Sequence, residues 1–198
     1  LTVMTIDGEG AKDLDDAVSL VKRGEGWRLY VHIADVSHYV REKTPLDRCV
    51  MNRGTSVYFT DKVVPMLPQV LSNGVCSLNA GEDKYALTAV INLDKNGEIV
   101  KTRIVPSIIN SRVRGVYSEV NEILENRADS ATRVKYKPVL PLIKRMHELY
   151  TILYKKISYS HLATVVGVPS PDDLTMHLGN TSRIFTRLCG LSANTPLE

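Results

Sequence analysis

The chain has 198 residues, of which 43% are hydrophobic, and carries a formal net charge of +3, so we expect a globular fold. Three widely spaced cysteines, Cys49, Cys76 and Cys189, exclude a Cys-x-x-Cys zinc ribbon and a disulfide framework. The sequence shows no signal-peptide pattern and no apolar run of membrane-spanning length. We therefore expect a cytoplasmic protein that does not bind a membrane.

Charge is distributed unevenly along the chain. Residues 7–16 hold five carboxylates, two glycines and one lysine, and the rest of the chain holds 24 basic and 17 acidic residues. Like charges this close repel one another unless a positive group lies among them. A concentrated acidic site on a basic body suits an anionic substrate that meets a bound cation.

Strand patterns at residues 1–6 and 17–22 flank this acidic segment. The glycines at 24 and 26 mark a turn into a third strand at 27–35. Thr44 as N-cap and Pro45 in the first turn predict a helix that ends near residue 52, with Gly54 beyond it. The proline-rich residues that follow, 55–80, are expected to be irregular.

An Asn-Gly pair at 96–97 predicts a hairpin between strands at 85–93 and 98–107. Helices are predicted over 117–127 and 140–157. The second has apolar residues at three- and four-residue spacing, namely Leu142, Met146, Leu149, Leu153 and Ile157. Beyond 158 we expect a loop at 168–173 and an imperfect helix at 174–191. The pattern as a whole predicts an α+β fold with a mixed or antiparallel sheet and packed helices.

The acidic segment has the chemistry of a metal site. Asp7 ends one predicted strand and Asp15 and Asp16 open the next, so a glycine-containing loop brings carboxylates from both strand ends together. Their oxygens suit Mg²⁺ or Mn²⁺, and two such ions about 3.5–4 Å apart can support phosphodiester hydrolysis. An EF-hand is excluded because, counted from Asp7 or Asp13, the fifth residue is alanine and the twelfth is not glutamate. This loop alone leaves catalytic and structural metal binding equally open.

Six blocks, in order and spacing, extend the argument over most of the chain. They cover residues 7–18, 32–37, 44–48, 52–59, 64–68 and 71–79. Together they resemble the catalytic (RNB) domain of the ribonuclease II/ribonuclease R family, and most closely its ribonuclease R branch. The resemblance runs from residue 1 to about residue 156.

This resemblance implies processive hydrolysis of single-stranded RNA from its 3′ end to nucleoside 5′-monophosphates, with Mg²⁺ as cofactor. The four metal-site aspartates of the family fall on Asp7, Asp13, Asp15 and Asp16. In the family the third of these, here Asp15, matters most for cleavage. Two tyrosines of the family contact RNA, one stacking on the terminal base and one near the sugar, and they correspond to Tyr58 and Tyr117.

The chain also departs from the family. Gly10, Leu14 and Thr60 stand where the family usually has an acid, an aromatic and a proline. The family's later half carries a Thr-Ser-Pro-Ile-Arg-Arg-Tyr block whose arginine contacts the scissile phosphate. Residues 181–187, which include Arg183 and Arg187, do not match that block.

We therefore divide the chain into 1–157, the N-terminal part of an RNB-type catalytic domain, and 158–198, a divergent segment of a truncated or frame-disrupted product. Loss of an arginine that stabilises transition-state charge costs about 10²–10³ in rate. We expect weak or no nuclease activity from this chain alone. An RNA- and metal-binding module without turnover, or an inactive fragment, are the alternatives.

Four other residues have competing interpretations. We expect His32 to be a hydrogen-bonded core histidine rather than a metal ligand, because the nearby acidic site prefers oxygen donors. Trp27 is expected in the core. Asp35 could cap a turn or bind a basic partner, with the structural role favoured. Arg53 could complement the end of a helix or contact phosphate, and the sequence does not choose between the two.

Overall fold

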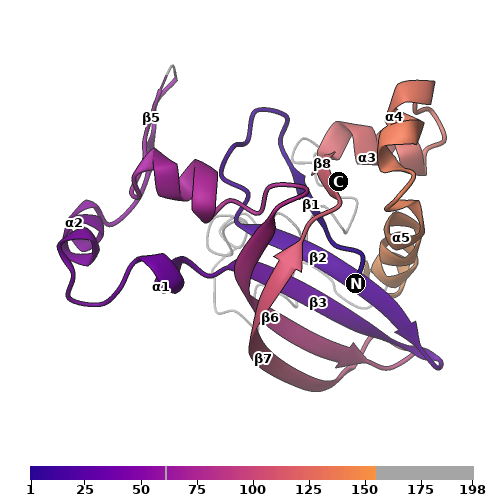
Figure 1. The fold of residues 1–198 in the computed structure, drawn as a ribbon. Coiled ribbons are helices and arrows are strands. Elements are labelled where there is room, and N and C mark those ends of the chain that lie inside the picture. Colours follow the sequence, from indigo (N-terminus) through magenta and orange to yellow (C-terminus); the bar gives the residue numbers. More distant parts are fainter. Residues whose placement is uncertain (61, 155–198) are drawn as a thin grey trace, which may run out of the picture.

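The computed structural model describes residues 1–60 and 62–154, and its body is a six-stranded mixed sheet (Figure 1). The strands lie in the order β7-β6-β3-β2-β1-β8. All neighbours pair antiparallel except β1 and β8, which run parallel. Their bounds are β1 Met4–Asp7, β2 Asp16–Arg23, β3 Gly26–Ala34, β6 Asp83–Leu93, β7 Ile99–Asn110 and β8 Val113–Val116. The expected α+β class with a mixed sheet is confirmed.

The predicted hairpin between β6 and β7 is present and each strand is longer than expected. Gly97 lies in its turn at φ +78°, a conformation that glycine adopts without strain, and donates a 3.1 Å hydrogen bond to the Asp94 carbonyl. β7 also contains Pro106, which cannot donate to a neighbouring strand. The residue is tolerated because β7 is at the edge of the sheet.

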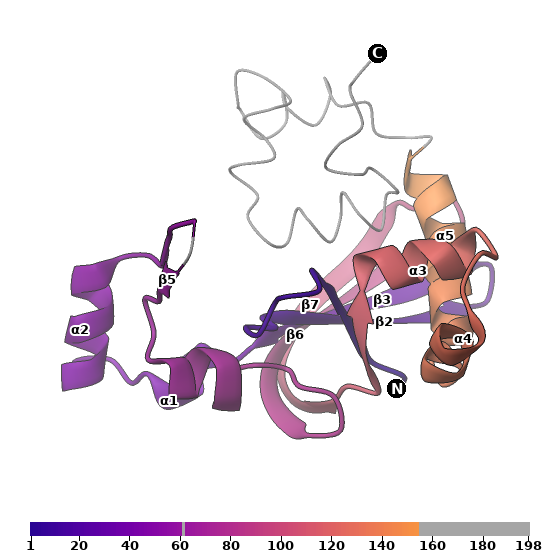
Figure 2. The ribbon, with the colours of Figure 1, turned by 90° about the horizontal axis from the view of Figure 1, so that it is seen from above.

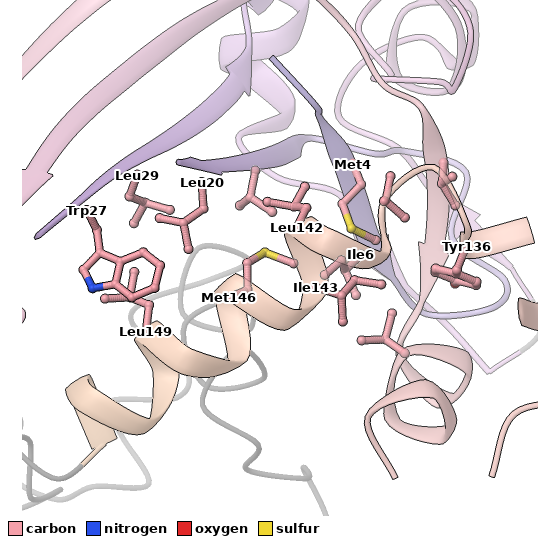
Figure 3. Close-up of a cluster of buried hydrophobic side chains, with 14 of the residues drawn as sticks. Met4, Ile6, Leu20, Trp27, Leu29, Tyr136, Leu142, Ile143, Met146 and Leu149 are labelled. Carbon is pink, nitrogen blue, oxygen red and sulfur yellow. The ribbon is translucent and has the colours of Figure 1, made fainter. Parts of the chain in front are cut away.

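The main core lies between one face of the sheet and the helix α5 (Leu140–Tyr154). Figure 3 shows Trp27 beside Leu149 at one end of this cluster and Tyr136 at the other end. Trp27 is only 2% exposed, so the expected core position of this residue is confirmed. The predicted helix at 140–157 is confirmed as far as Tyr154, and its last residues lie outside the described part of the chain.

A smaller core cluster covers the opposite face of the sheet. Neighbouring residues of a strand point to opposite faces, so Val18 joins the main core and Ala17 the smaller one. Leu14, from the acidic segment, is 1% exposed and belongs to this smaller cluster. The leucine that replaces the family's usual aromatic residue therefore fills a buried position.

A long excursion between β3 and β6, residues 36–75, is named the arm here. It carries α1 (Val36–Tyr39), α2 (Pro45–Arg53), the paired strands β4 (Val57–Tyr58) and β5 (Val63–Val64), and a π-helical turn, η1 (Val70–Val75). Figures 1 and 2 show α2 and β5 standing away from the sheet. None of the described residues of the arm is buried.

The predicted α2 is confirmed at both ends. The Asp47 N–H donates to the Thr44 hydroxyl at 3.2 Å, which caps the first turn, and Gly54 at φ +70° ends the helix. The expectation that 55–80 is irregular is wrong, because this stretch holds the β4–β5 pair and η1. Short elements of two to six residues leave too little periodicity to detect in sequence.

The helix predicted over 117–127 is shorter than expected. α3 spans Tyr117–Leu124, because Asn126 takes a left-handed conformation with φ +59° that a helix cannot contain. A helix that the sequence analysis missed follows, α4 (Ser130–Tyr136), capped by Asp129, which accepts the Thr132 N–H at 2.7 Å. The predicted loop at 168–173 and helix at 174–191 lie outside the described residues. Across the part described, none of the helices combines the length and apolar character needed to cross a membrane.

Candidate active site

Two strand ends bring the acidic residues together. β1 and β2 run antiparallel with Met4 opposite Val18. The end of β1 at Asp7 and the start of β2 at Asp16 therefore lie side by side, at the same end of the two strands. On the other side of β1, the parallel strand β8 places Val116 opposite Asp7. Residues 8–15 connect β1 to β2, and we call them the acidic loop.

The second half of the acidic loop is fixed to the segment just before β6. The fully buried Ser77 hydroxyl accepts the Leu14 N–H at 3.0 Å and donates to the Lys12 carbonyl at 2.9 Å. The Leu78 N–H donates to the Leu14 carbonyl at 2.9 Å. The Ala34 N–H, at the end of β3, donates to the Asp15 carbonyl, also at 2.9 Å.

The first half of the acidic loop is fixed by Arg114 of β8. Its Nη2 donates to the Glu9 carbonyl at 2.6 Å, to the Ala11 carbonyl at 2.9 Å and to the Gly8 carbonyl at 3.3 Å. No local sequence pattern points to a role for Arg114 or Ser77. Both contacts join residues more than 60 positions apart, which no local pattern can reveal.

Asp16 is the electrostatic centre of the site. It is 5% exposed, and its burial together with the negative charges of Asp7 and Asp15 raises its pKa to about 7. Its Oδ2 atom is buried and makes no hydrogen bond within the described residues. A buried carboxylate oxygen in this state is costly, and a cation beside it would favour the charged form.

Three of the four predicted metal-site aspartates, Asp7, Asp15 and Asp16, therefore interact with one another electrostatically. Asp13 is half-buried within the loop and is not among the carboxylates that raise the pKa of Asp16. Over residues 1–60 and 62–154, no three His, Cys, Asp or Glu side chains are gathered as a set that could hold a metal ion. Asp7, Asp15 and Asp16 thus share one electrostatic field.

The kinds of residue present nevertheless fit a hard divalent cation. The donors are carboxylate oxygens, which Mg²⁺ and Mn²⁺ prefer over the nitrogen and sulfur donors suited to zinc. The buried Oδ2 of Asp16 and the raised pKa of its carboxyl group identify where a positive charge would relieve the repulsion.

The two tyrosines with a predicted RNA contact lie in different surroundings. Tyr117 begins α3 directly after Val116, the partner of Asp7, and is half-buried against the main core. Tyr58 lies on β4 of the arm and is 69% exposed. β5, the partner strand of β4, stands apart from the acidic loop in both Figure 1 and Figure 2. The structure thus places Tyr117 near the acids and Tyr58 on a separate part of the molecule.

His32 is a core histidine, as expected. It is 2% exposed, its Nδ1 lies 2.7 Å from the Thr88 hydroxyl and its Nε2 lies 3.2 Å from the Ser19 hydroxyl. Burial lowers its pKa to about 4, so the ring is neutral near pH 7.

The structural interpretation of Asp35 is also confirmed. Its carboxylate accepts the His38 N–H at 3.1 Å and the Ser37 hydroxyl at 2.5 Å, capping α1. Arg53 closes α2 and donates to the Pro65 carbonyl at 3.0 Å, which links two parts of the arm.

Comparison with known proteins gives a consistent picture. The sequence model of the RNB domain matches residues 1–167. Ribonuclease R of Vibrio cholerae is 46% identical over 154 residues, which are 77% of this chain and 18% of that relative. The chain spans about a fifth of the length of the curated relatives it matches.

Solved structures agree with the sequence comparison. RNase R of Mycoplasma genitalium in complex with double-stranded RNA superposes with a TM-score of 0.73 at 33% identity, covering 79% of this chain and 27% of that one. The yeast pseudonuclease Ssd1 superposes with a TM-score of 0.64 at 20% identity, covering 85% of this chain and 18% of that one. At that identity, the second likeness concerns the fold alone.

Proposed function

The chain belongs to the RNB domain family, and from this membership we propose that it is the N-terminal part of the catalytic domain of a 3′-to-5′ exoribonuclease. The reaction would be hydrolysis of RNA to nucleoside 5′-monophosphates. The observation that carries the proposal is the buried Asp16 beside Asp7 and Asp15 at the edge of the sheet.

In this proposal Asp7, Asp13, Asp15 and Asp16 hold Mg²⁺, with Mn²⁺ as a substitute. The bound metal would supply an activated water and stabilise the leaving oxygen of the phosphodiester. The protein's own part is to keep the carboxylates at one sheet edge and to bury one of them, so that ion binding relieves their repulsion. Asp15, which is exposed and lies next to Asp16, is the residue we assign to cleavage.

The proposed substrate is the 3′ end of single-stranded RNA. Exposed aromatic rings stack on any base, which suits an enzyme that degrades RNA of any sequence, and Tyr58 is such a ring. Tyr117, beside the acids, would lie near the sugar. Structures of the Mycoplasma genitalium relative with double-stranded RNA and with ribose-methylated single-stranded RNA support RNA as the class of ligand.

A second candidate is an RNA- and metal-binding module without turnover. The observation that favours it is that Asp13 is not among the carboxylates that raise the pKa of Asp16, so an incomplete set of aspartates would hold a cation without supporting turnover.

A cleavage assay separates the candidates. The full chain is incubated with Mg²⁺ and a uniformly labelled RNA that has a single-stranded 3′ tail. We expect slow release of mononucleotides by the wild-type protein. The rate for Asp15→Asn should be lower by a factor of about 100 or more. Asp83→Asn, which changes an exposed carboxylate of β6, is the matched control and should retain the wild-type rate.

The outcomes are distinct. Equal rates for wild type and Asp15→Asn would refute the catalytic assignment. Salt-sensitive RNA binding without product in either protein would establish the binding module instead. Wild-type protein that binds neither Mg²⁺ nor RNA would contradict both candidates.

A further inference from the structure

The acidic loop contains a positive charge supplied from a distant strand. The Nη2 atom of Arg114 lies within 3.3 Å of three backbone carbonyls, those of Gly8, Glu9 and Ala11. Among the described residues, Arg114 makes every side-chain hydrogen bond to residues 8–11. The remaining bond in this segment is a local turn, from the Ala11 N–H to the Gly8 carbonyl at 3.1 Å.

The position of Arg114 is fixed by the backbone. Arg114 lies opposite Thr5 in the parallel pair of β8 and β1, two residues before the strand end at Asp7. At the next residue, Gly115, an added Cβ would come within 2.5 Å of the Thr5 carbonyl oxygen. The two strands are therefore in close contact, and the side chain of Arg114 starts from a rigid element before it reaches the loop.

Three converging carbonyl oxygens place partial negative charges together, in a segment that already carries carboxylates. A guanidinium group suits this position because it is permanently charged and carries several N–H donors in a fixed plane. Its contacts hold the chain that leaves Asp7, while Ser77 and Leu78 hold the chain that approaches Asp15. The two halves of the loop thus have separate supports, and only the first depends on a charged side chain.

We propose that Arg114 is a positioning residue for the metal site. Its guanidinium holds residues 8–11 so that the aspartates before and after them, Asp7 and Asp13, are kept in place for a divalent cation. The proposal rests on the proposed function, because it assumes that the aspartates bind Mg²⁺. It adds that the affinity for Mg²⁺ depends on a residue that does not itself contact the ion.

The test uses three variants of the full chain. Arg114→Gln removes the charge and most of the donors. Arg114→Lys keeps the charge without the planar group. Arg112→Gln is the matched control, because Arg112 is exposed, immediately precedes β8, and makes no side-chain hydrogen bond or ion pair within the described residues.

Each protein is measured in three ways: Mg²⁺ binding by calorimetry, hydrogen exchange of the Ala11 amide, which donates to the Gly8 carbonyl, and the midpoint of thermal unfolding. For Arg114→Gln we expect faster exchange of the Ala11 amide and an Mg²⁺ affinity about 10-fold weaker, the usual effect of losing a group that supports metal ligands. The exchange rate and the Mg²⁺ affinity of Arg114→Lys should lie between those of the wild type and Arg114→Gln. Both values for Arg112→Gln should match the wild type.

The outcomes separate this proposal from the proposed function. A lower unfolding midpoint for Arg114→Gln with unchanged Mg²⁺ affinity would make Arg114 a structural residue only and overturn the proposal. Unchanged exchange of the Ala11 amide would overturn it as well. If the wild type binds no Mg²⁺, the proposed function fails and the positioning role fails with it, whatever the exchange data show.

Discussion

The sheet body and the arm, residues 36–75, are stabilised in different ways. The body buries two hydrophobic clusters, one on each face of the sheet. It also holds the acidic residues where β1 ends and β2 begins. In the arm none of the described residues is buried, and helix caps and backbone hydrogen bonds define its elements. Stability therefore resides in the body, while the exposed aromatic Tyr58 is presented on a region that contributes little to the core.

This difference teaches how the proposed site is divided. Asp7 and Asp16 lie at the ends of rigid strands and Asp13 and Asp15 on the loop that joins them, where a displacement of a fraction of an ångström would alter metal binding. The proposed base-stacking ring, Tyr58, lies on the arm, where none of the described side chains is buried. Substitutions in the body should thus change stability and its pH dependence, whereas the substitution of Tyr58 in the arm should change RNA affinity.

The largest expected effect is on the core. Trp27→Ala should lower the free energy of unfolding by about 3–5 kcal/mol, because it removes the largest side chain of the main cluster. Met51→Ala, in α2 of the arm, should change it by less than about 0.5 kcal/mol, because Met51 is 74% exposed. Urea unfolding followed by circular dichroism measures both. Similar losses for the two variants would refute the division into body and arm.

The next effect is on pH dependence, and it too should come from the body. In the fold the pKa of Asp16 is about 7, against an ordinary value of 3.8. The folded protein therefore keeps a proton that the unfolded chain loses, so stability falls as pH rises from about 4 to about 7, by at most about 4 kcal/mol. Asp16→Asn should abolish this part of the pH dependence, and added Mg²⁺ should reduce it by favouring the charged carboxylate.

The measurement is the difference in unfolding free energy between wild type and Asp16→Asn, without metal, from pH 4 to pH 8. His32 acts in the opposite sense. Its pKa is lowered to about 4, so stability falls as pH drops below about 6.5. Because both proteins contain His32, its contribution cancels in the difference. A difference that does not vary with pH would contradict the assignment to Asp16.

An intermediate effect is expected on RNA affinity, and it should come from the arm. Tyr58→Ala should weaken binding of single-stranded RNA by about 1–3 kcal/mol, the usual contribution of one stacked base. The unfolding free energy should stay within about 0.5 kcal/mol of the wild type, because Tyr58 is exposed. Phe59→Ala, which changes the adjacent exposed ring, is the control in a fluorescence-anisotropy titration. Equal losses for both rings would show that stacking is not specific to Tyr58.

The smallest effect compares two helix caps. Thr44→Ala and Asp129→Ala each remove a side-chain cap, worth about 1 kcal/mol. The helix α4 carries the buried Tyr136, so Asp129→Ala should lower global stability. The helix α2 buries no residue, so Thr44→Ala should only speed hydrogen exchange within α2. A matching loss of global stability from Thr44→Ala would show that the arm and the body unfold together.

Local features of the fold could be predicted where one short segment contains the whole signal. The cap at Thr44, the turn at Gly97 and the apolar spacing of α5 each depend on neighbouring residues, and all three were predicted. The α4 helix was missed although Asp129 is a recognisable N-cap, because seven residues give barely two helical turns of pattern.

Long-range features could not be predicted in this way. The parallel pairing of β1 with β8 joins the first strand of the sheet to the last, and nothing in either segment specifies its partner. The same reason hides the contacts of Ser77 and Arg114 with the acidic loop. The four aspartates were identified by sequence, yet the burial that singles out Asp16 depends on neighbouring strands and becomes visible only in the fold.

Because β1 pairs with the much later strand β8, one support of the acidic loop can form only after β8 has been synthesised. The carboxylates of the acidic loop are synthesised before the arginine that contacts their backbone, which follows more than 100 residues later. Closing so long a segment is slow, because its entropy must be lost before the contacts form. A nascent chain that has not yet reached residue 114 therefore lacks the support for the first half of the acidic loop, and its full metal affinity should develop only after Arg114 has been synthesised.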